Sequence, residues 1–419
     1  MIKIQVGVGS FSARGFMSDR SLSLRLSVLA GALFVVSTNS LNIAGLLPNI
    51  AESLDVSIGS VSYGITVYAV VAAVASPMIA AVFSHRSRTS VLVSGMVLVA
   101  AGTLATALAP NLSWFIAGRA FAALGGAAVV PVVTAVAPQI VEPSWRGRAL
   151  ATVGLGFTAA TALGAPLATA LAAVTNWRFS IGTVAGLAAL AAFAMSRLTR
   201  GLPSGSAPAG RALRTVLSNP FVLIALLGNT LITLATEVVY IFSAEVSGRT
   251  GTSLAILLFF FGVAAIGGNH LGGWLTDRWG TGRAGLVGAA VLASVLLYLT
   301  LAGNNYLLAA VGFAVFGVTS YMVVVPRQYQ LIAIAPGVAT VSLSCFTTAM
   351  YIGLAFGPVI GAQLVPHGGS AVAFGGALIA CLAFALFLMG LLLQRRVRHV
   401  TPYPETSADT GNQIAKTPR

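Results

Sequence analysis

Apolar residues fill this chain in long runs that are separated by short polar connections. A run of about 20 mainly apolar residues, coiled as a helix, crosses the ~30 Å hydrocarbon core of a bilayer. The pattern predicts twelve such helices, at residues 22–47, 60–83, 89–109, 113–136, 147–174, 178–196, 220–244, 253–275, 283–302, 305–331, 340–365 and 371–394. Twelve apolar helices in succession cannot pack as one water-soluble protein. The chain is therefore predicted to be an all-α, polytopic membrane protein.

The positions of the charges indicate how the helices are oriented. Only 8% of the residues are charged, and a net charge of +14 would suggest a nucleic-acid partner in a soluble protein. Here all but three of the 23 Lys and Arg residues fall on the side that holds both termini; Arg178 and Arg249 lie opposite, and Arg119 lies inside the fourth helix. Such an excess marks cytoplasmic segments. We expect a multi-pass protein of the cytoplasmic (inner) membrane with both termini cytoplasmic, and no nucleic-acid partner.

The longest internal connection divides the helices into two sets of six. Residues 197–219 are rich in Gly, Pro, Ser and Arg, which is typical of a flexible linker. The predicted organisation is a cytoplasmic segment (1–21), a six-helix bundle (22–196), the linker (197–219), a second bundle (220–394) and a disordered cytoplasmic tail (395–419). Met17 is an alternative start. Matching connections follow the second and eighth helices, so we expect duplicated bundles with a site at their interface.

Four groups of residues carry a resemblance to a known family. They are 43–57 at the end of the first helix, Gly273 to Gly280 after the eighth, Gly118-Arg119 with Gly125-Gly126 in the fourth, and 160–167 in the fifth with its echo at 353–361. This combination resembles the major facilitator superfamily, more closely its twelve-helix drug:proton antiporters and the arabinose- and chloramphenicol-efflux exporters. The resemblance implies two pseudo-symmetric six-helix bundles around a central cavity, export by alternating access, and a monomer.

One of these motifs is a candidate gate at the cytoplasmic side. It comprises Gly273, Asp277, Arg278 and Gly280. The resemblance implies that it latches cytoplasmic helix ends together. The first half lacks the aspartate and has His85 instead, so that latch is expected to be weak. For the neighbouring arginines of the first half, a solvated basic loop is the favoured interpretation.

A second motif places small residues on single helix stripes. It comprises Gly156, Ala160, Gly164 and Pro166 in the fifth helix, and Gly353, Gly357, Pro358 and Gly361 in the eleventh. Small residues four apart allow helix backbones to approach closely, and proline bends a helix. We expect tightly packed, bendable helix pairs that permit the two halves to rock against each other.

Ionisable side chains at membrane depth are costly and are functional candidates by default. Glu237 is the single acidic residue predicted well inside a helix, and Arg119 the single basic one. Both are candidates for proton coupling. The alternatives are that Glu237 extends toward water or meets Arg249, and that Arg119 ties helices together without touching substrate.

Polar and aromatic residues suggest where a substrate binds. The candidates are Asn39, Ser40, Asn42, Tyr68, Tyr240, Tyr321 and Tyr351. Ser40 occupies the position of a first-helix acid in many similar exporters, so coupling through that acid is unavailable. The two asparagines share a helix face, where ligand contact and helix-to-helix bonding both remain open. Tyrosines suit an amphipathic solute, but they also pack well.

No motif for soluble-enzyme chemistry is present: there is no P-loop, HExxH, CxxC or plausible nucleophile elbow. No enzyme activity, cofactor or metal is expected. The predicted function is secondary active export of a small amphipathic or drug-like molecule, in exchange for protons. The alternatives are a sugar, nucleoside or amino-acid exporter of the same fold, and a non-transporting membrane sensor or scaffold.

Overall fold

The computed structural model describes residues 19–82, 86–142, 145–199, 202, 214, 216–302, 305–334 and 339–400. Within these ranges the regular structure is helical throughout. His85 and Met17 lie outside the described residues, as do most of the predicted linker and the tail from residue 401. The predicted domain boundaries therefore stay predictions.

The first half of the chain supplies six crossings. Its elements are α1 (Asp19–Leu41), η1 (Ala44–Leu46), α2 (Leu47–Leu54), α3 (Ile58–Val82), α4 (Arg88–Ala107), α5 (Leu112–Val136), η2 (Ala137–Gln139), α6 (Arg146–Ala159), η4 (Ala160–Gly164), α7 (Ala165–Val174) and α8 (Trp177–Leu198). The second half comprises α10 (Pro220–Ile241), α11 (Ser243–Ser247), α12 (Gly251–Ala302), α13 (Tyr306–Met322), α14 (Val324–Ile334), α15 (Ala339–Leu364), η6 (Val365–His367) and α16 (Gly369–Val400).

Among the described residues, eleven helical stretches are long and apolar enough to span a membrane, and one of them represents two crossings. The 52 residues of α12 would extend about 78 Å if straight, more than twice the hydrocarbon thickness. Gly280 bends this helix with φ 80° and ψ 160°, a conformation that residues with a side chain rarely adopt. The helices predicted at 253–275 and 283–302 are thus joined at a kink.

Two predicted helix ends are wrong. The apolar pattern extends the first helix to residue 47, but α1 ends at Leu41 and a short helix, α2, begins at Leu47. Pro48 lies at the start of α2, where the fixed φ of proline and its missing N–H favour beginning a new helix. At the other end of the chain, α16 continues to Val400, six residues beyond the predicted end at 394.

Two crossings are interrupted. The fifth consists of α6 and α7 joined by η4, a five-residue stretch of π-helix. The tenth breaks at Val323 between α13 and α14, three residues before Pro326. Proline lacks an N–H and clashes with the preceding turn, so Pro326 accounts for this break.

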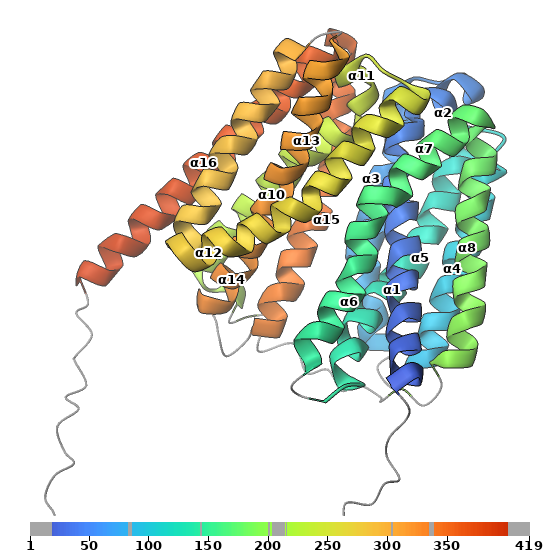
Figure 1. The fold of residues 1–419 in the computed structure, drawn as a ribbon, viewed down its shortest axis with the longest axis horizontal. Helices are drawn as coiled ribbons and strands as arrows, with labels where there is room; N and C mark the ends of the chain where they lie inside the picture. The colour runs from blue at the N-terminus through green and yellow to red at the C-terminus, as the bar shows by residue number, and fades with distance from the viewer. Residues whose placement is uncertain are drawn as a thin grey trace, which may run out of the picture.

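The two halves lean together at one end and diverge at the other (Figure 1). The start of α1 and the end of α16 both lie at the diverging end. We call the opposite end, which holds η1, α2 and α11, the joined end. Helices α3 and α15 pair the halves along one side, and α7 with η4 meets α12 along the other. We call these two contact lines the seam.

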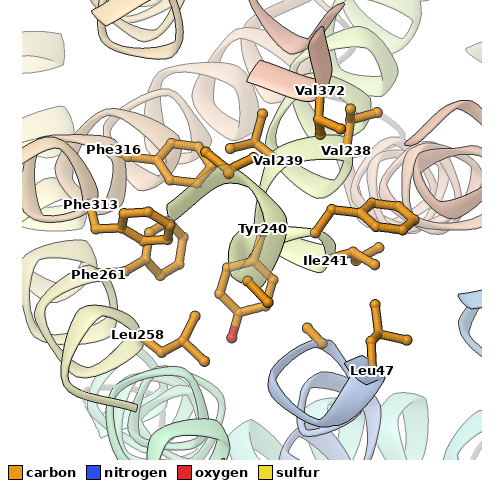
Figure 2. Packing of buried hydrophobic residues seen from close by; sticks show 14 of the residues in the cluster. Leu47, Val238, Val239, Tyr240, Ile241, Leu258, Phe261, Phe313, Phe316 and Val372 are labelled. Carbon is orange, nitrogen blue, oxygen red and sulfur yellow. The ribbon is translucent and has the colours of Figure 1, made fainter. Parts of the chain in front are cut away.

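The buried apolar residues repeat this arrangement. One hydrophobic cluster contains residues of both halves, among them Leu46 and Leu47 from the first and Tyr240 and Phe261 from the second. Figure 2 shows the Tyr240 ring reaching from α10 between Leu258 and Leu47. Four further clusters of described residues each remain within a single half, and the two larger ones comprise residues 29–202 and residues 216–349. Continuous apolar packing across the seam therefore occurs at the joined end.

Candidate functional site

Direct contacts cross the seam on both sides of the molecule. The Thr66 hydroxyl on α3 donates a hydrogen bond of 2.8 Å to the Ala355 carbonyl on α15. On the other side of the molecule, the hydroxyls of Thr161 and Tyr321 lie 3.2 Å apart. Gly262 of α12 lies so close to η4 that an added Cβ would be 2.3 Å from the Cα of Ala162. The halves are thus in backbone contact beside the central residues of the seam.

Arg119 lies at the centre of a buried polar cluster in the first half and is 1% exposed. Its Nη1 donates to the Asn39 carbonyl at 2.7 Å and lies 3.3 Å from the Asn39 Oδ1. The same Oδ1 accepts a hydrogen bond from Thr103 at 3.1 Å, and the Tyr68 ring lies under the guanidinium at 4.5 Å. The sequence-predicted Arg119, Asn39 and Tyr68 therefore belong to one site. Through these hydrogen bonds Asn39 joins α1 to α4 and α5.

This cluster holds more hydrogen-bond donors than acceptors. The Nε and Nη2 of Arg119 and the Nδ2 of Asn39 are buried and unpaired with protein atoms. Both amide atoms of Asn42, a donor and an acceptor, are also buried without a protein partner. A buried cation is expensive unless it is paired. Among the described residues, Tyr68 is the one group that interacts electrostatically with this guanidinium. The cluster can therefore donate hydrogen bonds to a bound molecule that carries acceptors.

Glu237 lies in a second cluster, on α10 of the other half. Its side chain is half-buried, and its Oε2 is buried without a hydrogen-bond partner. Gly357 of α15 packs against its Cβ. Tyr240 and Tyr321 lie within electrostatic range of its carboxyl, and Tyr321 reaches across the seam to Thr161. The carboxyl thus lies beside a contact between the two halves.

The remaining cavity candidates lie on neighbouring helices. Ser40 is half-buried near the end of α1. Tyr351 of α15 is half-buried and lies within electrostatic range of Tyr68, which is in the first half. Tyr240 is 3% exposed, and its ring packs on Phe261 with centroids 4.9 Å apart. Aromatic side chains thus line the seam beside both polar clusters.

Sequence reasoning missed a second buried arginine. The charge pattern assigns Arg327 to the cytoplasmic residues, but it lies on α14 and is 2% exposed. Its Nη1 donates to the Gln330 Oε1 at 2.5 Å, and its Cζ lies 3.1 Å from the centroid of the Phe387 ring. An added Cβ on Gly285 would be 2.1 Å from its Nη2. The sequence did carry a signal for its burial, because the predicted helix at residues 305–331 contains Arg327.

The small-residue motifs lie at close helix contacts. An added Cβ on Gly156 would be 2.1 Å from the Ala30 carbonyl, and one on Gly164 would be 2.1 Å from the Thr38 Oγ1. In the second half Gly353 packs on Thr233 and Gly361 on the Phe242 ring. Ala160 is buried; Pro166 begins α7 after the π-helix, and Pro358 lies inside α15. Each glycine thus lies where a larger residue would push two helices apart.

The candidate gate motif lies at the kink of α12. Asp277 and Arg278 are exposed, and the Arg278 guanidinium lies 5.7 Å from the Trp274 ring centroid. An added Cβ on Gly273 would have one neighbour within 4 Å, the Cγ1 of Val325 at 4.0 Å. Gly280 provides the positive φ of the kink. In this arrangement the halves diverge at this end, and the role of the motif stays a prediction.

An apolar hollow lies along α3. Six α3 residues between Val70 and Ile79 line it with Leu124 of α5, and no polar atom contributes to its surface. It begins four residues beyond Thr66, toward the end where the halves diverge. Such a surface is suited to an apolar group.

Comparison with known proteins identifies the family. Residues 29–343 match the model of the Major Facilitator Superfamily. The inner membrane transport protein YdhP of Escherichia coli K12 is 32% identical over 374 residues, which is 87% of this chain and 95% of the relative. The chain belongs to the major facilitator superfamily. A chloramphenicol resistance protein of Streptomyces lividans is 28% identical over 83% of this chain and 90% of its own length.

Solved structures of transporters share the fold. A point mutant of the nucleoside transporter NupG superposes with a TM-score of 0.75 at 11% identity, covering 88% of this chain and 99% of NupG. An inward-facing, occupied bacterial homologue of the lysosomal transporter Spinster gives 0.73 at 16% identity, covering 89% and 97%. The predicted fold class is confirmed: this is an all-α, multi-pass membrane protein of a transporter superfamily.

Proposed function

We propose that this protein is a secondary transporter that exports a small amphipathic molecule across the cytoplasmic membrane in exchange for protons, and that it is not an enzyme. The half-buried carboxyl of Glu237, with an unpaired oxygen beside a contact between the halves, carries the proposal. A carboxyl in such a place can take up a proton from one side and release it to the other as the halves rock. Arg119 contributes the second charged group of the mechanism.

The orientation follows from the charges. Because Lys and Arg concentrate on the side that holds the termini, that side is cytoplasmic. The diverging end of Figure 1 then faces the cytoplasm, and the joined end faces outward. The arrangement is therefore inward-open, in which a substrate enters from the cell interior. One chain is the transporting unit.

The substrate class follows from the surfaces near the seam. The hollow along α3 is wholly apolar, whereas the Arg119 cluster presents unpaired donors. A molecule with an apolar body and hydrogen-bond acceptors complements both surfaces. The chloramphenicol resistance protein among the relatives makes chloramphenicol a suitable first test compound.

Transport in proteoliposomes tests this proposal. Purified protein is reconstituted, a pH gradient is imposed, and accumulation of chloramphenicol and of ethidium, a lipophilic cation, is followed with and without the gradient. Glu237→Gln should abolish gradient-driven accumulation and leave folding and ligand binding intact. Glu52→Gln, which alters an exposed acid, should transport like the parent.

Full gradient-driven transport by the Glu237 variant would remove this residue as the proton carrier. The same assay with a panel of sugars, nucleosides and amino acids tests the alternative exporter. Absence of flux for every compound, together with binding of a protein partner, would favour the membrane sensor or scaffold.

A further inference from the structure

The hydrogen bond between Tyr321 and Thr161 joins the two halves through side-chain hydroxyls. Thr161 lies in the π-helix η4 of the first half, and Tyr321 lies near the end of α13 in the second. The Thr161 hydroxyl donates to the Phe157 carbonyl at 3.3 Å. Either hydroxyl can donate in the 3.2 Å contact; with the Thr161 proton directed to the Phe157 carbonyl, the Tyr321 hydroxyl is the donor.

A second acceptor for the Tyr321 hydroxyl lies nearby. The hydroxyls of Thr236 and Ser320, the residues just before Glu237 and Tyr321, lie 3.4 Å apart, so α10 and α13 approach each other at this level. Tyr321 also lies within electrostatic range of the Glu237 carboxyl, whose Oε2 is buried without a hydrogen-bond partner. Of the elements packed around Glu237, α10 itself contributes Tyr240, α13 contributes Tyr321, and α15 contributes the bare backbone of Gly357. Neither Glu245 of α11 nor Arg327 of α14 interacts with this carboxyl. Among the described residues, Tyr240 and Tyr321 are thus two groups that respond to its charge.

We propose that Tyr321 is a positioning residue that couples the protonation of Glu237 to closure of the joined end. While Glu237 is protonated, the Tyr321 hydroxyl donates to Thr161 and the halves are held together. A charged acceptor forms a hydrogen bond about twice as strong as a neutral one. Ionised Glu237 therefore draws the hydroxyl away from Thr161, and the joined end is released.

The direction in which protonation of Glu237 acts on the joined end is the one that proton exchange requires. Proton uptake from outside closes the joined end, and proton loss to the cytoplasm prepares it to open with substrate. This inference rests on the proposed function, and it adds a named contact by which one protonation event biases the two arrangements. The π-helix has a direct role, because it presents Thr161 to α13 where Gly262 allows α12 to approach.

Distances across the joined end test the coupling without substrate. Spin labels are placed at Ser57 and Ser253, exposed positions at the joined end of the first and second halves, after Cys345 and Cys381 are replaced by serine. In the parent, raising the pH should shift the distance distribution from short to long. Tyr321→Phe and Thr161→Val should raise the long-distance population about fivefold at low pH. Thr161→Ser retains the hydroxyl and should behave like the parent.

A matched control separates the coupling from a general loss of packing. The Tyr298 hydroxyl bonds to the Leu308 carbonyl within the second half, so Tyr298→Phe should leave the pH-dependent shift unchanged. A normal shift in Tyr321→Phe, together with its loss in Glu237→Gln, would overturn the role of Tyr321 and leave the proposed function intact. A normal shift in Glu237→Gln would instead contradict proton coupling through Glu237.

Discussion

Replacing Gly262 by alanine should destabilise the joined end specifically. The added Cβ would lie 2.3 Å from the Ala162 Cα and 2.3 Å from the Thr161 carbonyl oxygen, both atoms of the opposite half. Carbon atoms in contact lie about 3.5 Å apart, so the helices must separate by about 1.2 Å. Because both neighbours are backbone atoms, no side-chain rotation relieves the overlap.

Overpacking of this kind costs about 1–3 kcal/mol. The cost applies while the halves are in contact and disappears when they separate. The equilibrium should therefore shift toward an open joined end by a factor of about 5 to 150. The distance distribution between labels at Ser57 and Ser253 measures this shift directly.

Gly267→Ala is the matched control for Gly262→Ala. Gly267 lies on the same helix, and an added Cβ there would have no neighbour within 4 Å. This variant should retain the parent distance distribution. If Gly262→Ala also retains it, with unchanged yield and melting temperature, then close backbone contact at this position does not govern the closed arrangement.

Three further substitutions test other features. Burial raises the pKa of Glu245 from its ordinary 4.5 to about 7, so between these pH values the folded protein keeps a proton that the unfolded chain loses. The free energy of unfolding therefore falls by at most about 3 kcal/mol as the pH rises from 4.5 to 7. Glu245→Gln should flatten the dependence of melting temperature on pH over this range. Arg327→Lys loses the planar stacking on Phe387 and should lower the melting temperature in detergent, whereas an unchanged value would show that this contact adds no stability. Asn39→Asp places a carboxylate beside Arg119 and should raise the melting temperature above that of Asn39→Ala; the reverse order would contradict a shortage of acceptors in this cluster.

The fold could be predicted because its signals are local and repeated. Runs of apolar residues and their spacing fix twelve crossings, and family motifs fix the superfamily. The π-helix at residues 160–164 was not predictable, because it depends on how α6 and α7 pack against the other half. Helix α2 could have been found, since Pro48 and the left-handed Asp55 mark its ends.

The candidate site was predicted in part. Charge at membrane depth identified Glu237 and Arg119, because few residues there are ionisable. The same reasoning failed for Arg327, since a residue near a helix end was assumed to reach the cytoplasm. The partnership of Tyr321 with Thr161 could not be read from the chain, because the two residues are 160 positions apart and meet through the arrangement of the halves.

The apolar cluster at the joined end has a consequence for the cell. Leu46 and Leu47 are fully buried against residues of the opposite half, so this end contains closely packed hydrocarbon where a hydrated path would otherwise run. In the proposed orientation, this layer insulates the cytoplasm from ions and protons outside the cell. Under the proposed proton exchange, a leak would discharge the gradient that drives export. The same layer that closes the joined end would then preserve the cell's energy supply.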